Sequence, residues 1–268
     1  MKVLRLTSRD NPLLKKIRLL ASGSRRSPRE LAIAEGIRVL EEADRAGCEI
    51  DSVVFSEQFG SNARERRLLN AWLGRGVPLY EVKEHLFASV SSVQSPQGAL
   101  ALVRVPALSL TDVRRTPDPL ALLACGIQDP GNLGTLIRTA AAAGATLFCT
   151  FRGTVSVRNP KVIRSSAGAL FHLPLVEQVA ASDFRAYCSR HSIRLYRADA
   201  RDGIVYTEAE LKTSCAILLG NEGTGITEKE FAAVPAIRIP MARRVESLNV
   251  AMAGAIILFE AARQRLLL

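Results

Sequence analysis

The sequence predicts an α/β fold built around a parallel sheet, and three observations support this prediction. Short apolar runs typical of buried strands alternate along the chain with segments of helical periodicity. Such alternation is typical of a parallel sheet that helices cover on both faces. The clearest unit is residues 120–144, where an apolar run leads through a Pro-Gly turn into an alanine-rich helix that Gly144 can end.

The composition is that of a globular protein with a strong positive charge. The chain has 268 residues, enough for two modest domains, and a net charge of +10, which favours a polyanion such as nucleic acid as a partner. Its five cysteines are scattered without a CxxC pair, as expected for reduced thiols in a cytoplasmic protein. The histidines and cysteines lack metal-ligand spacing, and no apolar run approaches the roughly 20 residues of a membrane span. We therefore expect neither a metal site nor a membrane anchor.

The first part of the chain divides into an arm, a small α/β domain and a linker. We expect residues 1–29 to form a basic, mobile arm with a short helix near 12–20, residues 30–105 to form the domain, and 106–119, with three prolines, to form the linker. Within the domain, periodicity predicts helices at 30–46, 62–73 and 83–89, and strands at 49–55, 77–82 and 99–105.

Residues 120–268 are expected to form a second and larger domain. The predicted strands are 120–127, 146–150, 193–198, 216–219 and 237–240, and the predicted helices are 132–143, 159–169, 182–191 and 247–264. Ser247 is placed to cap the last helix, and Asn249 is expected just inside it, followed by a small-residue face that suits close packing.

Three loops of the second domain, within residues 129–144, 220–225 and 239–265, carry unusual residues. Arg138 lies one turn after Gly134 in the alanine-rich helix, either as a surface arginine or as a group that reaches a ligand. Residues 220–225, GNEGTG, follow a strand, where open α/β sheets bind ligands. Their spacing matches neither a Rossmann turn nor a P-loop, and Glu222 would repel a phosphate.

Two basic clusters are candidate RNA contacts, although each could also be a solvated surface. The first lies within residues 1–29 and the second follows the strand at 146–150; the residues singled out are Arg25, Arg26, Arg152, Arg158, Lys161 and Arg164. Aromatic residues are few, so stacking on bases is not expected to dominate binding.

Taken together, the three loops resemble the signature motifs of the TrmH/SpoU family within the SPOUT superfamily. The resemblance covers residues 120–268 in order, through PGN…G…R at 130–138, GNEGTG, and IPM…SLNV…FEAARQR, with NPKVIRSSAGALFHLPL as a further match. Residues 30–105 resemble, less specifically, the L30e-like RNA substrate-binding domain that often precedes it, through AEGIRVLEEA and SVSSVQSPQGALALV.

The resemblance implies a SPOUT-type parallel sheet with a deep trefoil knot at the C-terminal end, a homodimer packed through knot-side helices, and S-adenosylmethionine as cofactor. By position, the cofactor would be held by residues from four loops: Ala198, Leu219, Gly220, Asn221, Gly225, Ile239, Met241, Ser247 and Leu248.

The implied reaction is methyl transfer to a ribose 2′-hydroxyl of RNA. The residues carried over as catalytic are Arg138, Asn132, Glu222, Ser247 and Asn249. A guanidinium stays protonated, so Arg138 is expected to bind a phosphate and stabilise an alkoxide rather than act as a base. Glu222 is the alternative base, or it orients Arg138.

The front domain favours ribosomal RNA, of the 23S type, as the substrate. Two alternatives stay open: a methyltransferase acting on transfer RNA, and a non-catalytic RNA-binding or ribosome-assembly protein that kept the fold.

Overall fold

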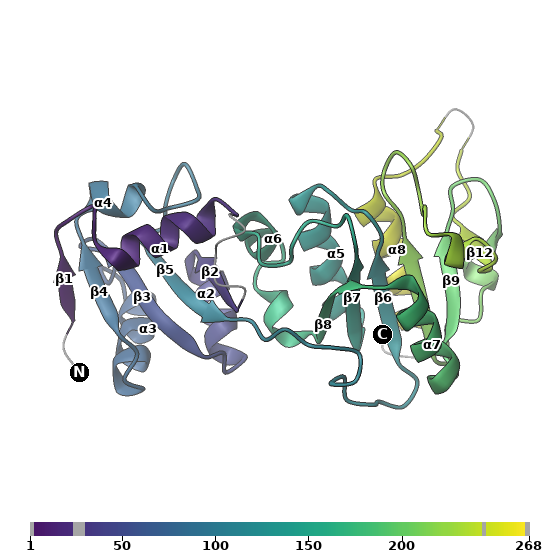
Figure 1. Cartoon of the computed structure of the whole chain (residues 1–268), viewed down its shortest axis with the longest axis horizontal. Coiled ribbons are helices and arrows are strands. Elements are labelled where there is room, and N and C mark those ends of the chain that lie inside the picture. The colour runs from purple at the N-terminus through teal and green to yellow at the C-terminus, as the bar shows by residue number, and fades with distance from the viewer. Residues whose placement is uncertain (1–2, 24–29, 243–244, 266–268) are drawn as a thin grey trace. The chain divides into compact units, whose positions relative to one another are not determined.

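The computed structural model describes residues 3–23, 30–242 and 245–265. The chain forms two compact units (Figure 1). The first contains the residues up to 106 together with 158–171, and the second contains 107–157 and the chain from 172 onward.

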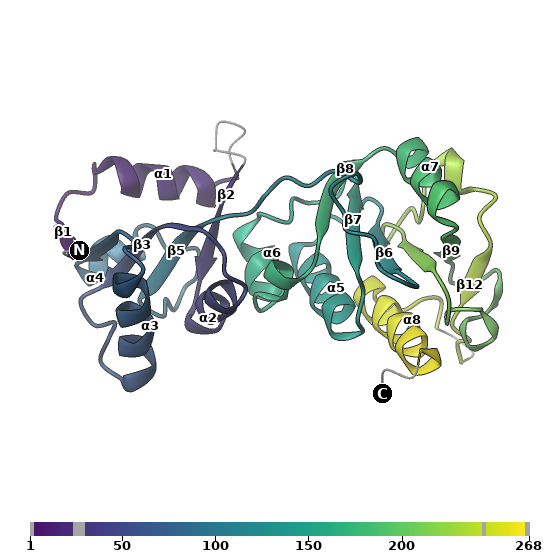
Figure 2. The same cartoon turned by 90° about the horizontal axis from the view of Figure 1, so that it is seen from below.

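The first unit is built on a mixed five-stranded sheet in the order β1-β4-β3-β5-β2. Its elements are β1 (Leu4–Leu6), α1 (Pro12–Ala21), β2 (Leu31–Glu35), α2 (Ile37–Arg45), β3 (Ile50–Ser56), α3 (Ala63–Gly74), β4 (Leu79–Val82), α4 (Glu84–Ala88), β5 (Ala99–Arg104) and, from later in the chain, α6 (Pro160–Ser165). Figure 2 shows α1 on one side of this sheet and α2 and α3 on the other.

The segment 30–46 differs from the helix predicted for it. Its first part is β2, an edge strand that pairs antiparallel with β5, and the helix α2 begins only after Gly36. Gly36 has a φ of 95°, a conformation that a side chain disfavours and that separates the two elements. All five residues of LAIAE are buried, whereas a helix of this sequence would expose one face. The prediction of one continuous helix was therefore wrong.

Much of the expected N-terminal arm is folded against the first unit. β1 pairs with β4, and α1 buries Leu14, Ile17 and Leu20 at helical spacing. Asn11 begins this helix, since its side-chain oxygen accepts from the Leu13 N–H at 2.9 Å. The basic residues of α1 therefore lie on the solvent side of a packed helix.

Residues 158–171 pack on the first unit, although we expected them within the second domain. Arg158 donates from Nη2 to the carbonyl of Val105 at 3.1 Å. A Cβ built on Gly168 would lie 2.5 Å from Cβ of Glu42, so only glycine allows this close approach to α2. The domain boundaries themselves stay a prediction.

The second unit contains a seven-stranded sheet in the order β10-β12-β9-β11-β6-β7-β8. The elements are β6 (Leu120–Ala124), α5 (Pro130–Ala142), β7 (Leu147–Phe151), β8 (Leu175–Val179), α7 (Ala181–His191), β9 (Arg194–Ala198), β10 (Ile204–Val205), η2 (Tyr206–Glu208), β11 (Cys215–Leu219), η3 (Lys229–Phe231), β12 (Ala236–Arg238) and α8 (Val250–Gln264). Every neighbouring pair is parallel. The predicted α/β fold with a parallel sheet is confirmed.

Helices cover both faces of this sheet. Figure 2 shows α7 on one side and α5 and α8 on the other. On the α7 side, the Phe151 ring meets Phe184 and Phe231 edge-on, with centroids 6.1 and 5.3 Å apart. β8 and β10 escaped the sequence analysis because β8 carries polar residues in its middle and β10 has two residues.

The five cysteines are unpaired, and four of them are buried. Burial raises the pKa of the Cys188 thiol to about 12 and raises that of Cys125 further. The buried thiols therefore stay protonated at neutral pH. No helix in the described part of the chain is both long and apolar enough to cross a membrane.

α8 approaches α5 closely because Gly254 lies at their contact. A Cβ built on Gly254 would lie 2.5 Å from Cδ2 of Leu136 on α5 and 2.7 Å from Cδ1 of Leu219 at the end of β11. A buried methyl group has no room there unless both leucines move.

We expect Gly254→Ala to lower the free energy of unfolding by about 1–3 kcal/mol, as overpacking does. Gly74→Ala is the matched control, because Gly74 also lies in a helix and faces open space. That substitution should stabilise the protein by about 0.4–1 kcal/mol. Urea unfolding followed by circular dichroism measures both, and equal stabilisation by the two would contradict the packing described for α8.

Candidate active site

The loops after β6 and β11 start side by side because these strands are parallel neighbours. Leu219 at the end of β11 pairs with Ala124 at the end of β6. Beyond the strands, the Cys125 N–H donates to the Leu219 carbonyl at 2.8 Å, and Nδ2 of Asn221 donates to the Gly126 carbonyl at 2.8 Å. Two of the three loops that the sequence singled out are thus joined at the carboxyl edge of the sheet.

The GNEGTG loop is a tight turn organised by Asn221. Asn221 and Gly225 exchange two backbone hydrogen bonds of 2.9 Å, and the Asn221 side-chain oxygen accepts from the N–H groups of Gly223 and Thr224. A Cβ on Gly220 would lie 2.4 Å from the Gly225 carbonyl carbon, and Gly225 has a φ of 68°. Glycine is required at both positions for the turn to close.

The third loop joins the other two through a chain of side-chain amides. Nδ2 of Asn249 donates to Oδ1 of Asn132 at 3.0 Å, and Nδ2 of Asn132 donates to Oε1 of Glu222 at 2.7 Å. Asn132 is itself fixed at the start of α5, where its N–H donates to the side chain of Asp129 at 2.8 Å. One residue from each loop therefore takes part in a single hydrogen-bonded row.

Asn249, rather than Ser247, caps α8. Its Oδ1 accepts from the N–H groups of Ala251 and Met252 at 2.9 and 3.3 Å. Ser247 is exposed and lies in a stretch without regular structure that continues to Asn249. The prediction that Ser247 caps the helix was wrong, because the helix starts at Val250, three residues later than expected.

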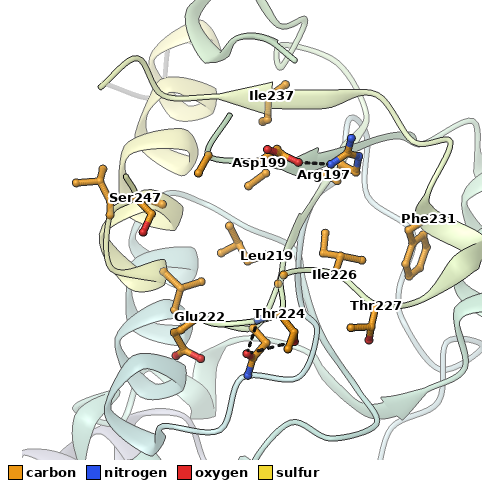
Figure 3. Close-up of a pocket in the computed structure, with 18 of the residues that line it drawn as sticks. Arg197, Asp199, Leu219, Glu222, Thr224, Ile226, Thr227, Phe231, Ile237 and Ser247 are labelled. Carbon is orange, nitrogen blue, oxygen red and sulfur yellow. Dashed lines mark hydrogen bonds and ion pairs between the residues drawn. The ribbon is translucent and has the colours of Figure 1, made fainter. Parts of the chain in front are cut away.

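A cavity of about 530 Å³ opens beside this row (Figure 3). It is lined by the loops after β9 and β11, by β12 and the residues after it, and by the start of α8. Its lining includes every residue that the sequence analysis carried over for the cofactor: Ala198, Leu219, Gly220, Asn221, Gly225, Ile239, Met241, Ser247 and Leu248.

An ion pair between Arg197 and Asp199 forms part of the wall and was not singled out from the sequence. Nη1 of Arg197 lies 2.5 Å from Oδ2 of Asp199 (Figure 3). Burial raises the pKa of Asp199, but hydrogen bonds from the N–H groups of Arg201 and Asp202 and from Arg197 outweigh it and lower the pKa below its usual value. Asp199 is therefore ionised at neutral pH. Its place directly after β9 was the available signal.

The five expected catalytic residues fall into three groups. Glu222 and Ser247 line the cavity, whereas Asn132 and Asn249 lie in the row beside it. Arg138 is exposed on α5 and does not line the cavity, and it has no ion-pair or hydrogen-bond partner among the described residues. Glu222 is thus engaged with Asn132 and not with Arg138.

The expected RNA-binding residues differ in their surroundings. Arg152 and Lys161 are exposed, while Arg164 is half-buried and donates to the Ser92 hydroxyl at 3.2 Å. Arg158 is also half-buried, and burial lowers its pKa. Arg25 and Arg26 lie outside the described residues. Within the described ranges, no group of three or more potential metal ligands comes together.

Comparison with known protein families gives two matches that together span most of the chain. Residues 119–259 match the SpoU rRNA Methylase family, and residues 11–101 match the MRM3-like substrate binding domain. The chain belongs to the SpoU rRNA methylase family. The first match contains all three loops that form the site.

Relatives of similar length carry names that agree with this assignment. The 23S rRNA (guanosine(2553)-2′-O)-methyltransferase RlmP of Bacillus subtilis is 28% identical over 95% of this chain and 97% of its own. An uncharacterized tRNA/rRNA methyltransferase of Synechocystis is 30% identical over 97% of this chain and 94% of its own.

Solved structures of SpoU methyltransferases are similar over both units. An AdoMet-bound rRNA methyltransferase from Sinorhizobium meliloti has a TM-score of 0.84 and 28% identity over 97% of this chain and 98% of its own. The SpoU methyltransferase AviRb from Streptomyces viridochromogenes, in complex with AdoMet, has a TM-score of 0.85 and 25% identity over 96% and 99% of the two chains.

The cap and the amide row can be separated by substitutions at Asn249. Asn249→Ala removes both and should lower the free energy of unfolding by about 0.5–2 kcal/mol, the usual effect of losing an N-cap. Asn249→Asp keeps an acceptor for the helix N–H groups but loses the donor to Asn132, so stability should stay closer to that of the parent. Ser247→Ala should leave stability unchanged in the same urea titration. A larger loss from Ser247→Ala than from Asn249→Ala would contradict the assignment of the cap.

Proposed function

We propose that this chain transfers a methyl group from S-adenosylmethionine to a ribose 2′-hydroxyl of ribosomal RNA. The observation that carries the proposal is the row from Asn249 through Asn132 to Glu222 beside a cavity lined by all nine expected cofactor residues. The names of the relatives, which specify 23S rRNA 2′-O-methylation, support the same reaction and the same class of RNA.

The cavity fits an adenosine-containing cofactor. Its volume of about 530 Å³ lies in the usual range for small-molecule sites. Leu219, Ile239 and Leu248 give it apolar surface, and the close turn at Gly220 lets the backbone of Gly225 and Ile226 form part of its wall. The ionised Asp199 offers an acceptor for hydroxyl or ammonium groups. When bound, S-adenosylmethionine supplies an electrophilic methyl group on a positively charged sulfur.

In this proposal Glu222 receives the substrate hydroxyl. Its Oε1 accepts from Asn132, while Oε2 has no hydrogen-bond partner within the described part of the chain. Oε2 can therefore accept a hydrogen bond from the ribose 2′-hydroxyl and take its proton, with Asn132 and Asn249 holding the carboxylate in position.

Arg138 then acts through its permanent charge. A guanidinium stays protonated at neutral pH and cannot serve as a base. It can bind the phosphate next to the target ribose and stabilise negative charge that develops on the 2′-oxygen. Its lack of an ion-pair partner among the described residues leaves it available for an RNA phosphate.

Methyl transfer from radiolabelled S-adenosylmethionine to purified ribosomal RNA tests this function. We expect transfer to ribosomal RNA and none to transfer RNA, with the label retained on a ribose after digestion to nucleosides. Arg138→Ala should lower the rate at least about 100-fold, as loss of one charge-stabilising donor does, with cofactor affinity unchanged in a binding titration. Arg190→Ala, an exposed arginine on α7, is the matched control. Full activity of Arg138→Ala would refute its assigned role.

The first unit supplies the RNA-binding surface in this proposal. The match to a substrate binding domain covers residues 11–101, and α6 with Lys161 and Arg164 packs on the same unit. Arg152 belongs to the second unit, directly after β7 at the carboxyl edge of its sheet, and would contact RNA there. Lysine and arginine side chains here bind phosphates and so hold the RNA without reading its sequence.

We further propose that the C-terminal segment forms a deep trefoil knot. After β12 pairs with β9, the chain returns across the carboxyl edge of the sheet to α8, whose Gly254 contacts α5 and β11. This return beside the loop at 219–226 is the arrangement that threading requires. An experimental chain trace in which α8 passes outside that loop would contradict the knot.

Finally, we propose a homodimer that packs through α8. Met252 and Phe259 are 50% and 40% exposed, and with Ala255 and Ile256 they form an apolar stripe at helical spacing on the solvent side of the helix. Such a stripe is costly to expose in a monomer and suits a symmetric contact.

We expect the double substitution Met252→Asp and Phe259→Asp to convert a dimer into a monomer, because it would place four carboxylates in one apolar contact. Light scattering after size-exclusion chromatography measures the mass. Val3→Asp, at an exposed apolar residue of the first unit, is the control and should leave the mass unchanged. A parent protein that is monomeric at micromolar concentration would end this proposal.

A further inference from the structure

A second cavity of about 520 Å³ lies in the second unit, at the opposite edge of its sheet from the first. Four of its lining residues directly precede strands of the parallel sheet: Pro119, Thr146, Ile193 and Ser214. The cofactor cavity instead follows the carboxyl ends of β9 and β11. The remaining lining comes from residues 113–118, from Ala121 on β6 and Leu147 on β7, and from Tyr187 and His191 on α7.

The wall of this second cavity is held by hydrogen bonds to the sheet and to the last helix. The Cys215 N–H donates to the Pro119 carbonyl at 2.9 Å. Arg265, just after α8, donates from Nη1 to the Asp118 carbonyl at 2.5 Å and from Nη2 to the Thr213 carbonyl at 2.5 Å. Asp118 is fixed between two prolines with a φ of 44°. The cavity is therefore a built feature of the unit and not a gap under a loose segment.

Two arginines give the cavity a positive mouth. Arg114 and Arg115 are both exposed, and neither has an ion pair or hydrogen bond to any residue that the structure describes. Asp118 is the one carboxylate among the lining residues, so the lining carries a net positive charge. This charge favours an anionic ligand and disfavours a cationic one.

Two aromatic rings lie on the α7 side of the same cavity. The Tyr187 and His191 rings are 4.5 Å apart between centroids and tilted by 48°. Burial raises the pKa of Tyr187, and the charge of Arg115, which lines the same cavity, opposes this. The hydroxyls of Thr116, Thr146 and Ser214 add hydrogen-bonding groups around apolar surface.

An anion-binding mouth beside aromatic rings and hydroxyls matches the three parts of a nucleotide: phosphate, base and ribose. The volume is adequate for one such group. We propose that the second cavity binds a single nucleotide of the RNA strand, away from the methylated ribose, with its phosphate at Arg114 and Arg115 and its base against Tyr187 and His191. The inference rests on the proposed function in so far as RNA is the substrate. It would add an anchoring contact that sets how far the strand extends from the catalytic cavity.

The test is equilibrium binding of a labelled single-stranded RNA fragment of ribosomal RNA to the full chain. S-adenosylhomocysteine is present at saturation, so that the first cavity cannot accept the probe. Affinity is measured over a series of salt concentrations. For Arg114→Ala with Arg115→Ala, the slope of log affinity against log salt should fall by roughly 0.7, the value for one lost phosphate contact on a single strand.

Arg185→Ala with Arg190→Ala removes the same charge from exposed positions on α7 that do not line the cavity, and it should leave the slope unchanged. His191→Ala should weaken binding about fivefold or more, by loss of stacking, without a change in slope at pH 8. Equal effects of the two arginine pairs, or an unchanged affinity in His191→Ala, would overturn the proposal.

Separate titrations with guanosine 5′-monophosphate and inorganic phosphate distinguish the source of the ligand. The monophosphate could bind as tightly as RNA and lose this binding in Arg114→Ala with Arg115→Ala. That result would overturn the proposal, because the ligand of the cavity would then be a free nucleotide and not a nucleotide of the RNA strand. Methyl transfer by the parent is measured on the same preparation. If the parent methylates RNA but the cavity substitutions have no effect on binding, this inference alone is wrong. If the substitutions weaken binding as expected but the parent transfers no methyl group, the proposed function alone is wrong.

Discussion

The side-chain amide of Asn132 is the contact on which the arrangement of the site depends. An amide presents a donor and an acceptor in one plane, and here each is used toward a different loop: Nδ2 toward Glu222 and Oδ1 toward Asn249. An aspartate at this position could not donate to Glu222, and a leucine could do neither. Because Asn132 lies in the first turn of α5, the row is anchored to a helix that packs on the sheet. Three loops that are far apart in the sequence are thereby held next to one another.

Close backbone approach is the second requirement, and glycine supplies it both in the loop after β11 and in α8. Gly220 lets the loop after β11 fold back onto Gly225, and Gly254 lets α8 lie against Leu136 and Leu219. Without these approaches, Glu222 and Asn249 would stand further from Asn132, and hydrogen bonds of 2.7 and 3.0 Å could not form. The small residues that made the loops visible in the sequence are therefore the ones that bring the polar residues together.

The sequence predicted the parallel sheet and the loops of the site because both depend on local patterns. Strands such as β6 and β11 are continuous apolar runs, and the glycine turns follow them directly. It did not predict β2, since LAIAE satisfies the helical spacing of the segment that follows, and only pairing with β5 decides its structure. The sequence analysis chose Ser247 as the cap of α8, although serine and asparagine are equally good caps. What selects Asn249 is its contact with Asn132, which lies 117 residues away in the sequence. The second cavity had no signal at all, because its lining comes from four separate segments whose meeting depends on the sheet order.

The distribution of paired and unpaired charges separates the roles of the arginines. Arg197, which is half-buried in the wall of the first cavity, forms an ion pair with Asp199. Arg265 donates hydrogen bonds to three backbone carbonyls. Arg138, Arg114 and Arg115 have no such partners within the described residues and remain in solvent. A cation held on a rigid helix or beside a preformed cavity, without an internal counterion, gains most from an anion that arrives from outside. The polyanion that the net charge of +10 attracts would supply the missing counterion at all three, and in our proposals these arginines would bind one RNA strand at two points.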